Sequence, residues 1–254
     1  MVTNTVLVTG AAGGMGAEAV ATLARRGANV ICVDLDRPAL DSLVASLGAW
    51  ERQLLAVKAD VSDEHAMERA IDEGEDRFGA IDGLFNIAGS EGSLAQLHDM
   101  RVEDFDAILA INATSVFVSM RLLVPRFIAR GGGRIVNTGS YAAVRATRGT
   151  SAYGAAKHAV VGLTRAVALE YAPHGVRANV LCPGAMNTRM MRPMFARLGA
   201  GDLRAGEEII RALMPTHDLI EPHELAGTGS WMLLDAPDQF TGQVVMVDGG
   251  RYAG

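Results

Sequence analysis

The sequence predicts an α/β fold, in which one doubly wound domain over residues 1–254 holds a seven-stranded parallel sheet with helices on both faces. Short β-branched runs alternate with longer helical segments along the whole chain. A glycine-rich turn directly follows the first of these runs. No break in composition, repeat or low-complexity stretch marks a linker, so we expect a single domain.

Seven short apolar runs are expected to be buried strands: residues 5–8, 29–33, 54–57, 81–87, 134–138, 176–181 and 243–247. Six longer segments are expected to be helices: residues 17–26, 38–47, 64–78, 102–128, 151–171 and 222–234. The methionine-rich residues 189–214 are expected to be helical in parts and to form a substrate lid. Ligands of such sheets bind beyond the carboxyl ends of the strands, where the polar and glycine-rich stretches of this chain fall.

The composition limits the classes of function. Hydrophobic residues make up 49% of the chain and charged residues 20%, which allows a large core. The net charge of −6 argues against nucleic acid as a main partner. The two cysteines do not make a disulfide framework, and the six histidines lack the spacing of metal ligands. We see no signal peptide and no apolar run that approaches the ~18 residues of a membrane span, so we expect a cytoplasmic protein without a membrane partner.

The glycine-rich turn lies between the first expected strand and its helix. Gly10, Gly14 and Gly16 allow a phosphate to approach the backbone, and the next helix directs its positive N-terminus at it. Asp34 ends the second expected strand, where a carboxylate can bind a ribose hydroxyl and repel a 2′-phosphate. A structural turn and a solvated loop acid are the alternatives. We expect nucleotide binding and favour NAD over NADP, although Arg37 lies close to Asp34 in sequence.

Tyr153 and Lys157 are four residues apart on an expected helix and therefore share one face. A phenol has a reference pKa of ~10, and a nearby cation favours the phenolate. The pair is thus a candidate proton donor and acceptor. On spacing alone, a half-buried tyrosine beside a solvated lysine is the more common arrangement.

Together the motifs resemble those of the short-chain dehydrogenase/reductase family, which has a Rossmann-type fold. They cover essentially the whole chain in the family's order and spacing: Thr9-Gly10-x-x-x-Gly14-x-Gly16, Asn86-x-Ala88-Gly89, Ser140, Tyr153-x-x-x-Lys157, Pro183-Gly184 and Thr241-Gly242-Gln243 before Asp248-Gly249-Gly250. The resemblance implies hydride transfer between a nicotinamide and a substrate carbon.

The resemblance implies four catalytic residues. Tyr153 is the expected acid/base, and Lys157 is expected to lower the Tyr153 pKa and to hold the nicotinamide ribose. Ser140 is expected to hydrogen-bond the reacting substrate oxygen. Asn112 matches the residue that holds a water of the proton relay; a helix-interior asparagine satisfied by its own helix is the alternative.

The resemblance also implies a set of cofactor contacts, among them Asp60 and Val61 at the adenine and Thr188 at the carboxamide. The full set is Thr9, Gly10, Gly14, Met15, Gly16, Asp34, Leu35, Asp60, Val61, Asn86, Ala88, Gly89, Tyr153, Lys157, Pro183, Gly184 and Thr188.

Two residues depart from the family pattern. Ile87 stands where the family has a second asparagine, and we expect it to be an apolar packing substitute. Gly139 stands where the family often has serine, and we expect it to widen the space beside the substrate.

The sequence predicts an oxidoreductase that interconverts a secondary alcohol and a ketone. Substrate contacts are expected in residues 90–97, 142–150 and 189–214, and the methionines of the last range suit an apolar or cyclic alcohol or ketone, or a 3-oxoacyl thioester. Packing of a lid helix on the core is the alternative role for those methionines. A catalytically silent NAD-binding sensor or scaffold, or an epimerase or dehydratase on the same fold, are the alternative functions. The resemblance further implies a homotetramer.

Overall fold

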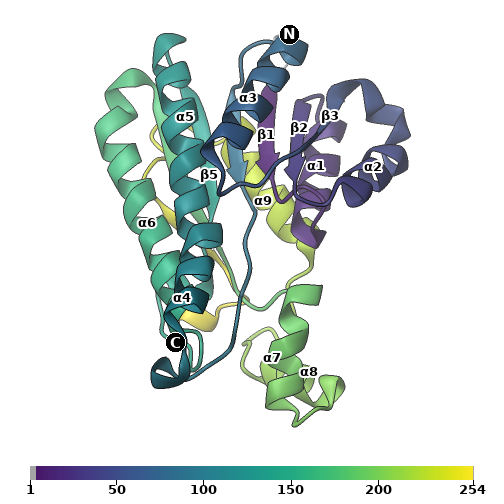
Figure 1. Cartoon of the computed structure of the whole chain (residues 1–254), viewed down its shortest axis with the longest axis vertical. Coiled ribbons are helices and arrows are strands. Elements are labelled where there is room, and N and C mark those ends of the chain that lie inside the picture. Colours follow the sequence, from purple (N-terminus) through teal and green to yellow (C-terminus); the bar gives the residue numbers. More distant parts are fainter. Residues whose placement is uncertain (1–3, 254) are drawn as a thin grey trace.

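Seven parallel strands form one sheet in the order β3-β2-β1-β4-β5-β6-β7 (Figure 1). The computed structural model describes residues 4–253. The strands are β1 (Thr5–Thr9), β2 (Asn29–Asp34), β3 (Leu54–Lys58), β4 (Gly83–Asn86), β5 (Gly133–Thr138), β6 (Val176–Pro183) and β7 (Val244–Val247). The crossover from β3 past β1 to β4 reverses the strand order beside β1, which puts the ligand site of such a sheet at the end of β1 and β4. The predicted fold class is confirmed.

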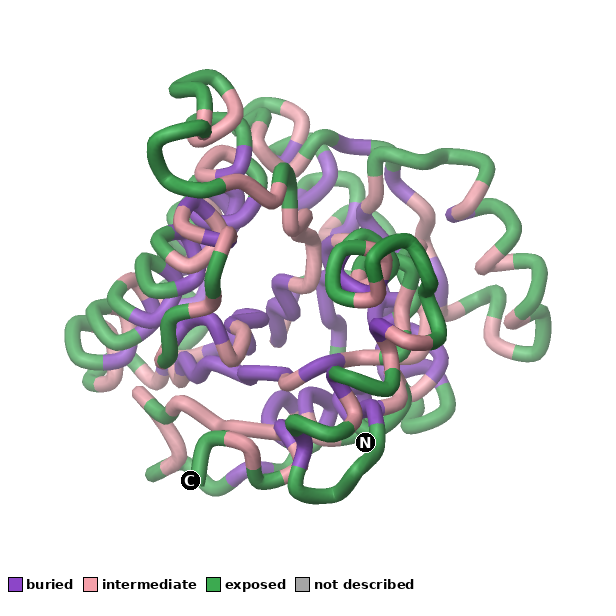
Figure 2. The backbone as a smooth tube through the Cα atoms, turned by 90° about the horizontal axis from the view of Figure 1, so that it is seen from below, coloured by how far each residue is buried: buried purple, intermediate pink, exposed green. Residues whose placement is uncertain are grey.

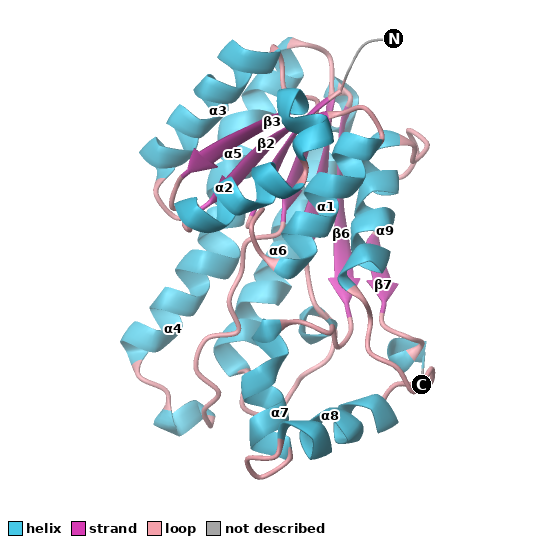
Figure 3. Ribbon diagram, turned by 90° about the vertical axis from the view of Figure 1, so that its right-hand side faces the viewer, coloured by secondary structure: helices cyan, strands magenta, loops and turns pink. Residues whose placement is uncertain are grey.

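Nine α-helices connect or flank the strands within the described residues: α1 (Gly14–Arg25), α2 (Arg37–Ser46), α3 (Glu64–Phe78), α4 (Val102–Leu109), α5 (Ser115–Ala129), α6 (Ser151–Tyr171), α7 (Arg192–Leu198), α8 (Leu203–Ala212) and α9 (Pro222–Leu234). Short 3-10 turns occur at η1 (Gly48–Gln53), η2 (Leu97–Asp99), η4 (Tyr141–Ala143), η5 (Ala172–His174), η6 (Arg189–Met191) and η7 (Arg251–Ala253). Figure 3 shows the strands enclosed between helices.

The two faces of the sheet have separate cores. Helices α1, α2 and α9 cover one face, where Leu23, Leu40 and Leu225 are fully buried. Helices α3, α5 and α6 cover the other, where Ile71 and Phe127 are fully buried. In Figure 2 the buried residues gather in the middle of the molecule and the exposed residues lie on its outside. Burial on both sides explains why the strands are nearly uninterrupted apolar runs.

The expected helix 102–128 differs from the structure in its middle. A π-helical turn, η3 (Ala110–Thr114), joins α4 to α5 without breaking the helical path. The expected strand 81–87 is also shorter, since β4 ends at Asn86 and leaves Ile87 outside the ladder. Ile87 packs against the core on the α1 side, so the expected apolar substitution is confirmed.

The helical run Val102–Ala129 is long and apolar enough to cross a membrane by composition, with a mean hydropathy of 1.8 over its best window. The sequence-based statement that no such run exists was therefore wrong. More than half of that window, 56%, is buried inside the protein. The run is apolar because α5 packs on the sheet beside α3 and α6.

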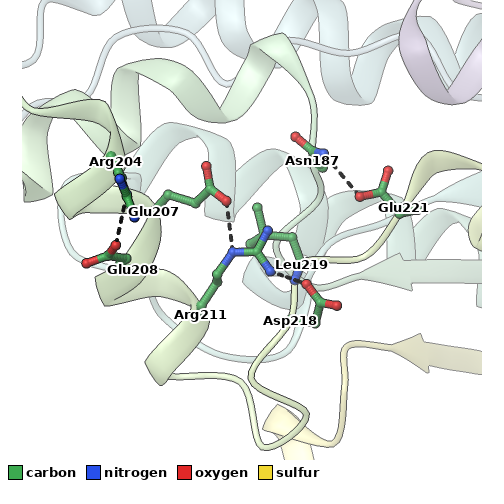
Figure 4. A network of polar contacts seen from close by, with 8 residues as sticks. All are labelled: Asn187, Arg204, Glu207, Glu208, Arg211, Asp218, Leu219 and Glu221. Atoms are coloured by element: carbon green, nitrogen blue, oxygen red, sulfur yellow. Dashed lines mark hydrogen bonds and ion pairs between the residues drawn. The ribbon is translucent and has the colours of Figure 1, made fainter.

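Residues 189–214 form η6, α7 and α8 beyond the carboxyl end of the sheet, toward which the arrowheads of β6 and β7 point (Figure 3). The chain entering this excursion pairs with the chain leaving it, because Met186 bridges Ile220 and the Asn187 amide donates to the Glu221 carboxylate at 3.0 Å. Arg211 of α8 is ion-paired with Glu207 and with Asp218 (Figure 4). The expected partial helicity of this segment is confirmed.

Candidate active site

The glycine-rich turn forms a tight cradle at the carboxyl end of β1. A Cβ atom on Gly16 would lie 2.0 Å from the Gly10 carbonyl oxygen, and one on Gly10, whose φ is +66°, would lie 2.7 Å from the Ala88 backbone. Gly13 caps α1 without any side-chain hydrogen bond, so the first N–H groups of α1 are not used by a capping side chain. Helix N-termini of this kind bind phosphate, and the cradle fits the pyrophosphate of a dinucleotide.

Asp34 closes one side of this cradle. Its carboxylate accepts the Ala12 N–H at 3.0 Å and the Asp36 N–H at 3.1 Å, which fixes a negative charge at the end of β2. Arg37 pairs with Asp41 at 2.8 Å and not with Asp34. Leu35, which follows Asp34, is 61% exposed and so presents an apolar side chain next to the carboxylate in sequence.

The remaining residues expected at the adenine side lie at the next strand end. The Asp60 carboxylate accepts both the hydroxyl and the N–H of Ser62, at 2.7 and 2.9 Å. These bonds lower the pKa of Asp60. Val61 is half-buried against the α3 side of the sheet. Met15, in contrast, is buried in the core, so only its backbone can meet a ligand.

Thr9 and Asn86 join the strand ends through a buried hydrogen-bond network. The Thr9 hydroxyl accepts the N–H groups of Ile87 and Ala88, at 3.1 and 3.3 Å. The Asn86 amide accepts from Ser119 at 2.9 Å and donates to Asn137 at 2.8 Å. Because the Asn86 side chain is hydrogen-bonded to residues of β5 and α5, it supports the segment of Ala88 and Gly89 and is not free to bind a ligand.

Asn112 lies in the π-helical turn and clamps the chain that follows Gly89. Its amide oxygen accepts the Ser90 N–H at 3.1 Å, and its amide nitrogen donates to the Ser90 carbonyl at 2.8 Å and to the Ile108 carbonyl at 2.9 Å. The local bond to Ile108 matches the helix-interior alternative, but the two bonds to Ser90 reach across to another loop. A Cβ on Gly89 would lie 2.8 Å from the Asn112 amide oxygen and 3.6 Å from Lys157 Nζ, so these three residues meet at one point.

Tyr153 and Lys157 share one face of α6, as their spacing predicts. Lys157 is only 3% exposed, and its ammonium donates to the Thr138 carbonyl at the end of β5, at 2.8 Å. The same Nζ lies 5.6 Å from the centre of the Tyr153 ring. Ser140 begins η4 just past Thr138, and its hydroxyl accepts the Ala142 N–H at 3.1 Å. This leaves the Ser140 proton free for Tyr153 or a substrate oxygen.

The pKa values of this pair are set by burial. Burial raises the pKa of Tyr153 to about 12; a hydrogen bond with Ser140 opposes this, and the charges of Glu91 and Cys182 add to it. Burial likewise lowers the pKa of Lys157 to about 8, against the opposing effect of Cys182. The net result is a raised Tyr153 pKa, because removal from water outweighs the effect of Ser140. The expectation that Lys157 lowers this pKa stays a prediction.

The space beside Ser140 is closed, contrary to the expectation for Gly139. A Cβ on Gly139 would lie 2.5 Å from the Cys182 thiol and 2.7 Å from Val180. Cys182 fills the volume that a side chain at residue 139 would occupy, so the missing side chain does not widen the substrate space. Burial raises the pKa of Cys182 to about 11, while the Ser140 N–H bonded to the thiol and the charge of Lys157 lower it. The thiol is thus a neutral packing group.

The turn after β6 returns to the glycine cradle. Gly184 donates its N–H to the Val247 carbonyl at 2.9 Å, and its backbone packs so closely on Asp248 that a Cβ would lie 2.9 Å from the Asp248 Cα. Pro183 ends the ladder beside Val247. The Thr188 methyl would lie 3.6 Å from a Cβ on Gly14, so Thr188 lies beside the start of α1. The segments that follow β1, β4 and β6 therefore lie against one another, Gly10 at Ala88 and Gly14 at Thr188.

Comparison with known proteins identifies the fold and its chemistry. Residues 4–199 match the family model of the short chain dehydrogenases. Levodione reductase of Leifsonia aquatica is 34% identical over 250 residues, which are 98% of this chain and 94% of the relative. The chain belongs to the short-chain dehydrogenase family. It is therefore an oxidoreductase that acts on CH–OH groups with a nicotinamide cofactor.

Other family members are equally similar over their full length. The 2,5-dichloro-2,5-cyclohexadiene-1,4-diol dehydrogenase of Sphingobium indicum is 36% identical and covers 98% of this chain and 97% of its own. Cyclohexanol dehydrogenase of an Acinetobacter species is 34% identical, with 96% and 92% covered. The crystal structure of levodione reductase superposes with a TM-score of 0.95 at 34% identity, covering 99% of this chain and 98% of that one. An actinorhodin polyketide ketoreductase variant with NADPH has a TM-score of 0.93 at 27% identity, with 98% and 97% covered.

Two residues of the site lie outside the expected set. The Thr138 carbonyl fixes the Lys157 ammonium, and no side-chain motif could reveal a backbone acceptor. Glu91 lies close enough to act on the pKa of Tyr153, and its sequence position in the expected substrate range 90–97 was the only signal. Within the described residues, no group of three or more His, Cys, Asp or Glu side chains is placed to hold a metal ion.

Proposed function

We propose that this protein is an NAD-dependent oxidoreductase that interconverts a secondary alcohol and a ketone on an alicyclic substrate, with Tyr153 as the acid/base. The observation that carries the proposal is the position of Tyr153, whose pKa Ser140 lowers and which lies one helical turn from the buried Lys157, with 5.6 Å from the Lys157 Nζ to the ring centre.

The proton chemistry follows from these side chains. In the oxidative direction Tyr153 as phenolate accepts the alcohol proton, and Ser140 donates a hydrogen bond to the substrate oxygen. In the reductive direction the neutral Tyr153 hydroxyl donates that proton to the carbonyl oxygen. The nicotinamide supplies the hydride acceptor or donor. Lys157, which the Thr138 carbonyl orients, binds the nicotinamide ribose and supplies positive charge when it is protonated. Asn112 holds the loop at Ser90 and so fixes the chain segment next to Lys157.

The preference for NAD rests on Asp34. Its fixed carboxylate can bind the two hydroxyls of an unphosphorylated ribose and repels a 2′-phosphate. Arg37, the one basic residue close by in sequence, is engaged by Asp41. The NADPH of the polyketide ketoreductase structure belongs to a protein at 27% identity, whereas the preference proposed here rests on Asp34 of this chain.

The cyclic substrate class is supported by the relatives and by the lid. Cyclohexanol dehydrogenase and the 2,5-dichloro-2,5-cyclohexadiene-1,4-diol dehydrogenase carry cyclic substrates in their names. Beside the site, Met190 and Leu198 expose 41% and 39% of their surface, while Met194 and Met214 are buried in the core. Some methionines of the lid thus pack in the core and others are exposed. The exposed ones can adapt to the shape of an apolar substrate.

A homotetramer is the expected assembly. Exposed apolar side chains lie on the helices that the family resemblance places at interfaces, with Phe117 on α5 47% exposed, Leu169 on α6 82% and Trp231 on α9 41%. The two free, buried cysteines suit a reducing compartment, and we place the protein in the cytoplasm. Light scattering after size exclusion tests the assembly, and a monomer would contradict it.

The function is tested by following nicotinamide absorbance with NAD⁺ or NADP⁺ and a panel of cyclohexanol, cyclic diols, acyclic secondary alcohols, sugars and 3-hydroxyacyl thioesters. We expect NADH formation with cyclic alcohols, and none with Tyr153→Phe, which should still bind NADH by fluorescence titration. Turnover by Tyr153→Phe at the wild-type rate would refute the acid/base assignment. Substrate conversion without net NADH formation would favour an epimerase or dehydratase.

A further inference from the structure

Glu91 lies in a loop that runs along α6 past Tyr153. The loop starts at Gly89, where a Cβ would be 3.6 Å from Lys157 Nζ. It reaches Ala95, which forms a bridge with Thr150 and donates its N–H to Gly149 at 3.1 Å. Thr150 and Lys157 flank Tyr153 on either side along the chain. A loop that touches both ends of this stretch passes Tyr153 between them, which is where Glu91 falls.

The backbone on both sides of Glu91 is fixed before any substrate arrives. The Asn112 amide holds the N–H and the carbonyl of Ser90, and the Ser90 hydroxyl accepts the Gly92 N–H at 3.2 Å. Gly92 has φ +67° and packs on Ile108, where a Cβ would lie 2.4 Å from the isoleucine side chain. Glu91 is thus held between two anchored residues, as preorganised binding groups are.

The Glu91 carboxylate is nevertheless left without a partner. Its Oε2 atom is buried and has no hydrogen-bond donor within the described residues. No ion pair of residues 4–253 includes Glu91, although other acids of the chain, such as Asp235, Glu64 and Glu75, are paired with arginines. Burial raises its pKa, and its charge in turn raises the pKa of Tyr153. Glu91 is only partly buried, but its one buried oxygen still lacks a donor, an arrangement that costs free energy and that a ligand with a donor would relieve.

We propose that Glu91 binds a substrate hydroxyl other than the one that reacts, and so selects alicyclic substrates that carry two oxygen functions, such as cyclic diols and hydroxyketones. An ionised carboxylate can only accept hydrogen bonds, so the substrate must donate, which a hydroxyl does and an unsubstituted ring carbon does not. The reacting oxygen meets Ser140 and Tyr153, and the second hydroxyl meets Glu91 of the loop that passes Tyr153. This inference rests on the proposed alcohol oxidation and adds the substrate class to it.

The test compares kcat/KM for cyclohexanol with kcat/KM for cyclohexane-1,2-diol and cyclohexane-1,4-diol, with NAD⁺, in the wild type, Glu91→Leu and Glu91→Gln. We expect the wild type to prefer one of the diols. Loss of a hydrogen bond to a charged group should lower the diol-to-cyclohexanol ratio about tenfold to a hundredfold in Glu91→Leu. Glu91→Gln keeps an acceptor without the charge and should lie between. Asp99→Asn removes an exposed acid from the same connection and should leave the ratio unchanged.

A second readout separates binding from a structural role. With the Glu91 charge removed, the rising limb of the pH profile for cyclohexanol oxidation should move to lower pH in Glu91→Gln, since the other groups that act on Tyr153, namely Ser140, Cys182 and Lys157, are unchanged. A diol-to-cyclohexanol ratio that is the same in all four proteins would overturn the inference and leave the proposed function standing. A wild type that oxidises none of these alcohols would overturn the proposed function, and this inference with it.

Discussion

Gly139 faces Cys182 across β5 and β6 so closely that a Cβ atom on residue 139 would lie 2.5 Å from the thiol sulfur. The two residues therefore share one volume beside Ser140, whose backbone N–H lowers the pKa of the same thiol. We expect Gly139→Ala to destabilise the fold by about 1–3 kcal/mol, the usual cost of overpacking a core. It should also lower kcat, because the strain is adjacent to Ser140. Chemical denaturation and steady-state kinetics measure the two effects.

A double mutant tests whether Cys182 is the residue that resists the added methyl group. Gly139→Ala with Cys182→Ala should regain part of the lost stability, giving a coupling energy between the neighbours. Gly162→Ala is the matched control, since no atom lies within 4 Å of a Cβ there and alanine favours a helix by about 0.5–1 kcal/mol. If the stability changes of Gly139→Ala and Cys182→Ala simply add, Cys182 is not the residue that resists the added methyl group.

The Tyr153 pKa predicts the pH dependence of the two directions. Because burial raises this pKa to about 12, Tyr153 is neutral at physiological pH, and the phenolate needed for oxidation becomes more abundant as the pH rises. Alcohol oxidation should therefore accelerate from pH 7 to pH 10, while ketone reduction, which needs the neutral hydroxyl, should not. Bound cofactor adds its own charge, so profiles of kcat/KM and of NADH binding are to be measured separately. An oxidation rate that is flat over this range would contradict the assignment of Tyr153 as the base.

Lys157 is predicted to lower the stability of the cofactor-free protein. Its folded pKa of about 8 lies below the usual lysine value of 10.5, so the folded state disfavours the charged form and gains stability as the pH rises from about 8 to 10.5. At pH 7 this pKa shift corresponds to a loss of about 3 kcal/mol in folding free energy. The hydrogen bond from Lys157 to the Thr138 carbonyl offsets part of that loss. Lys157→Met should thus raise the free energy of unfolding at pH 7 by about 1–2 kcal/mol while it weakens NAD⁺ binding and abolishes turnover.

Thermal unfolding of the cofactor-free protein at pH 7 and at pH 10 measures this prediction. The gain should be present at pH 7 and shrink at pH 10, where wild-type Lys157 is neutral. Lys58→Met removes an exposed lysine and serves as the control for the loss of one charge. A less stable Lys157→Met protein at both pH values would mean that the bond to Thr138 outweighs the buried charge.

The sequence predicted what depends on local patterns and missed what depends on contacts between distant segments. The β-branched runs that end at Thr9 and Asp34 follow from burial on both faces of a parallel sheet. The π-helical turn at Asn112 follows from the clamp on Ser90 and leaves no mark on the apolar pattern of the helix. The role of Gly139 likewise needed the neighbouring strand, and the raised pKa of Tyr153 needed its burial.

Asp34 is predicted to determine the choice of cofactor. Asp34→Asn removes the charge and keeps one amide oxygen to accept the Ala12 N–H. Two like charges about 5 Å apart repel by about 1 kcal/mol in water and by more in a less polar site, so the kcat/KM ratio of NADP⁺ to NAD⁺ should rise roughly tenfold. Arg37→Ala, which breaks only the pair with Asp41, should leave the ratio nearly unchanged. A wild type that already prefers NADP⁺ would contradict this role of the carboxylate.

The excursion of α7 and α8 is predicted to close over the substrate, which hydrogen exchange can follow. Exchange of residues 189–214 should slow when NADH and a substrate analogue bind, and unchanged exchange would argue against a lid. Arg211 joins α8 to Asp218 on the returning chain, so Asp218→Ala should speed exchange in the unliganded protein up to about fivefold, the effect of losing an exposed ion pair of at most ~1 kcal/mol. Arg204→Ala is the control, because its pair with Glu208 lies within α8 and does not tie the helix to the returning chain (Figure 4). If both variants speed exchange equally, the stability of helix α8 itself, and not the ion pair between Arg211 and Asp218, limits the opening of residues 189–214.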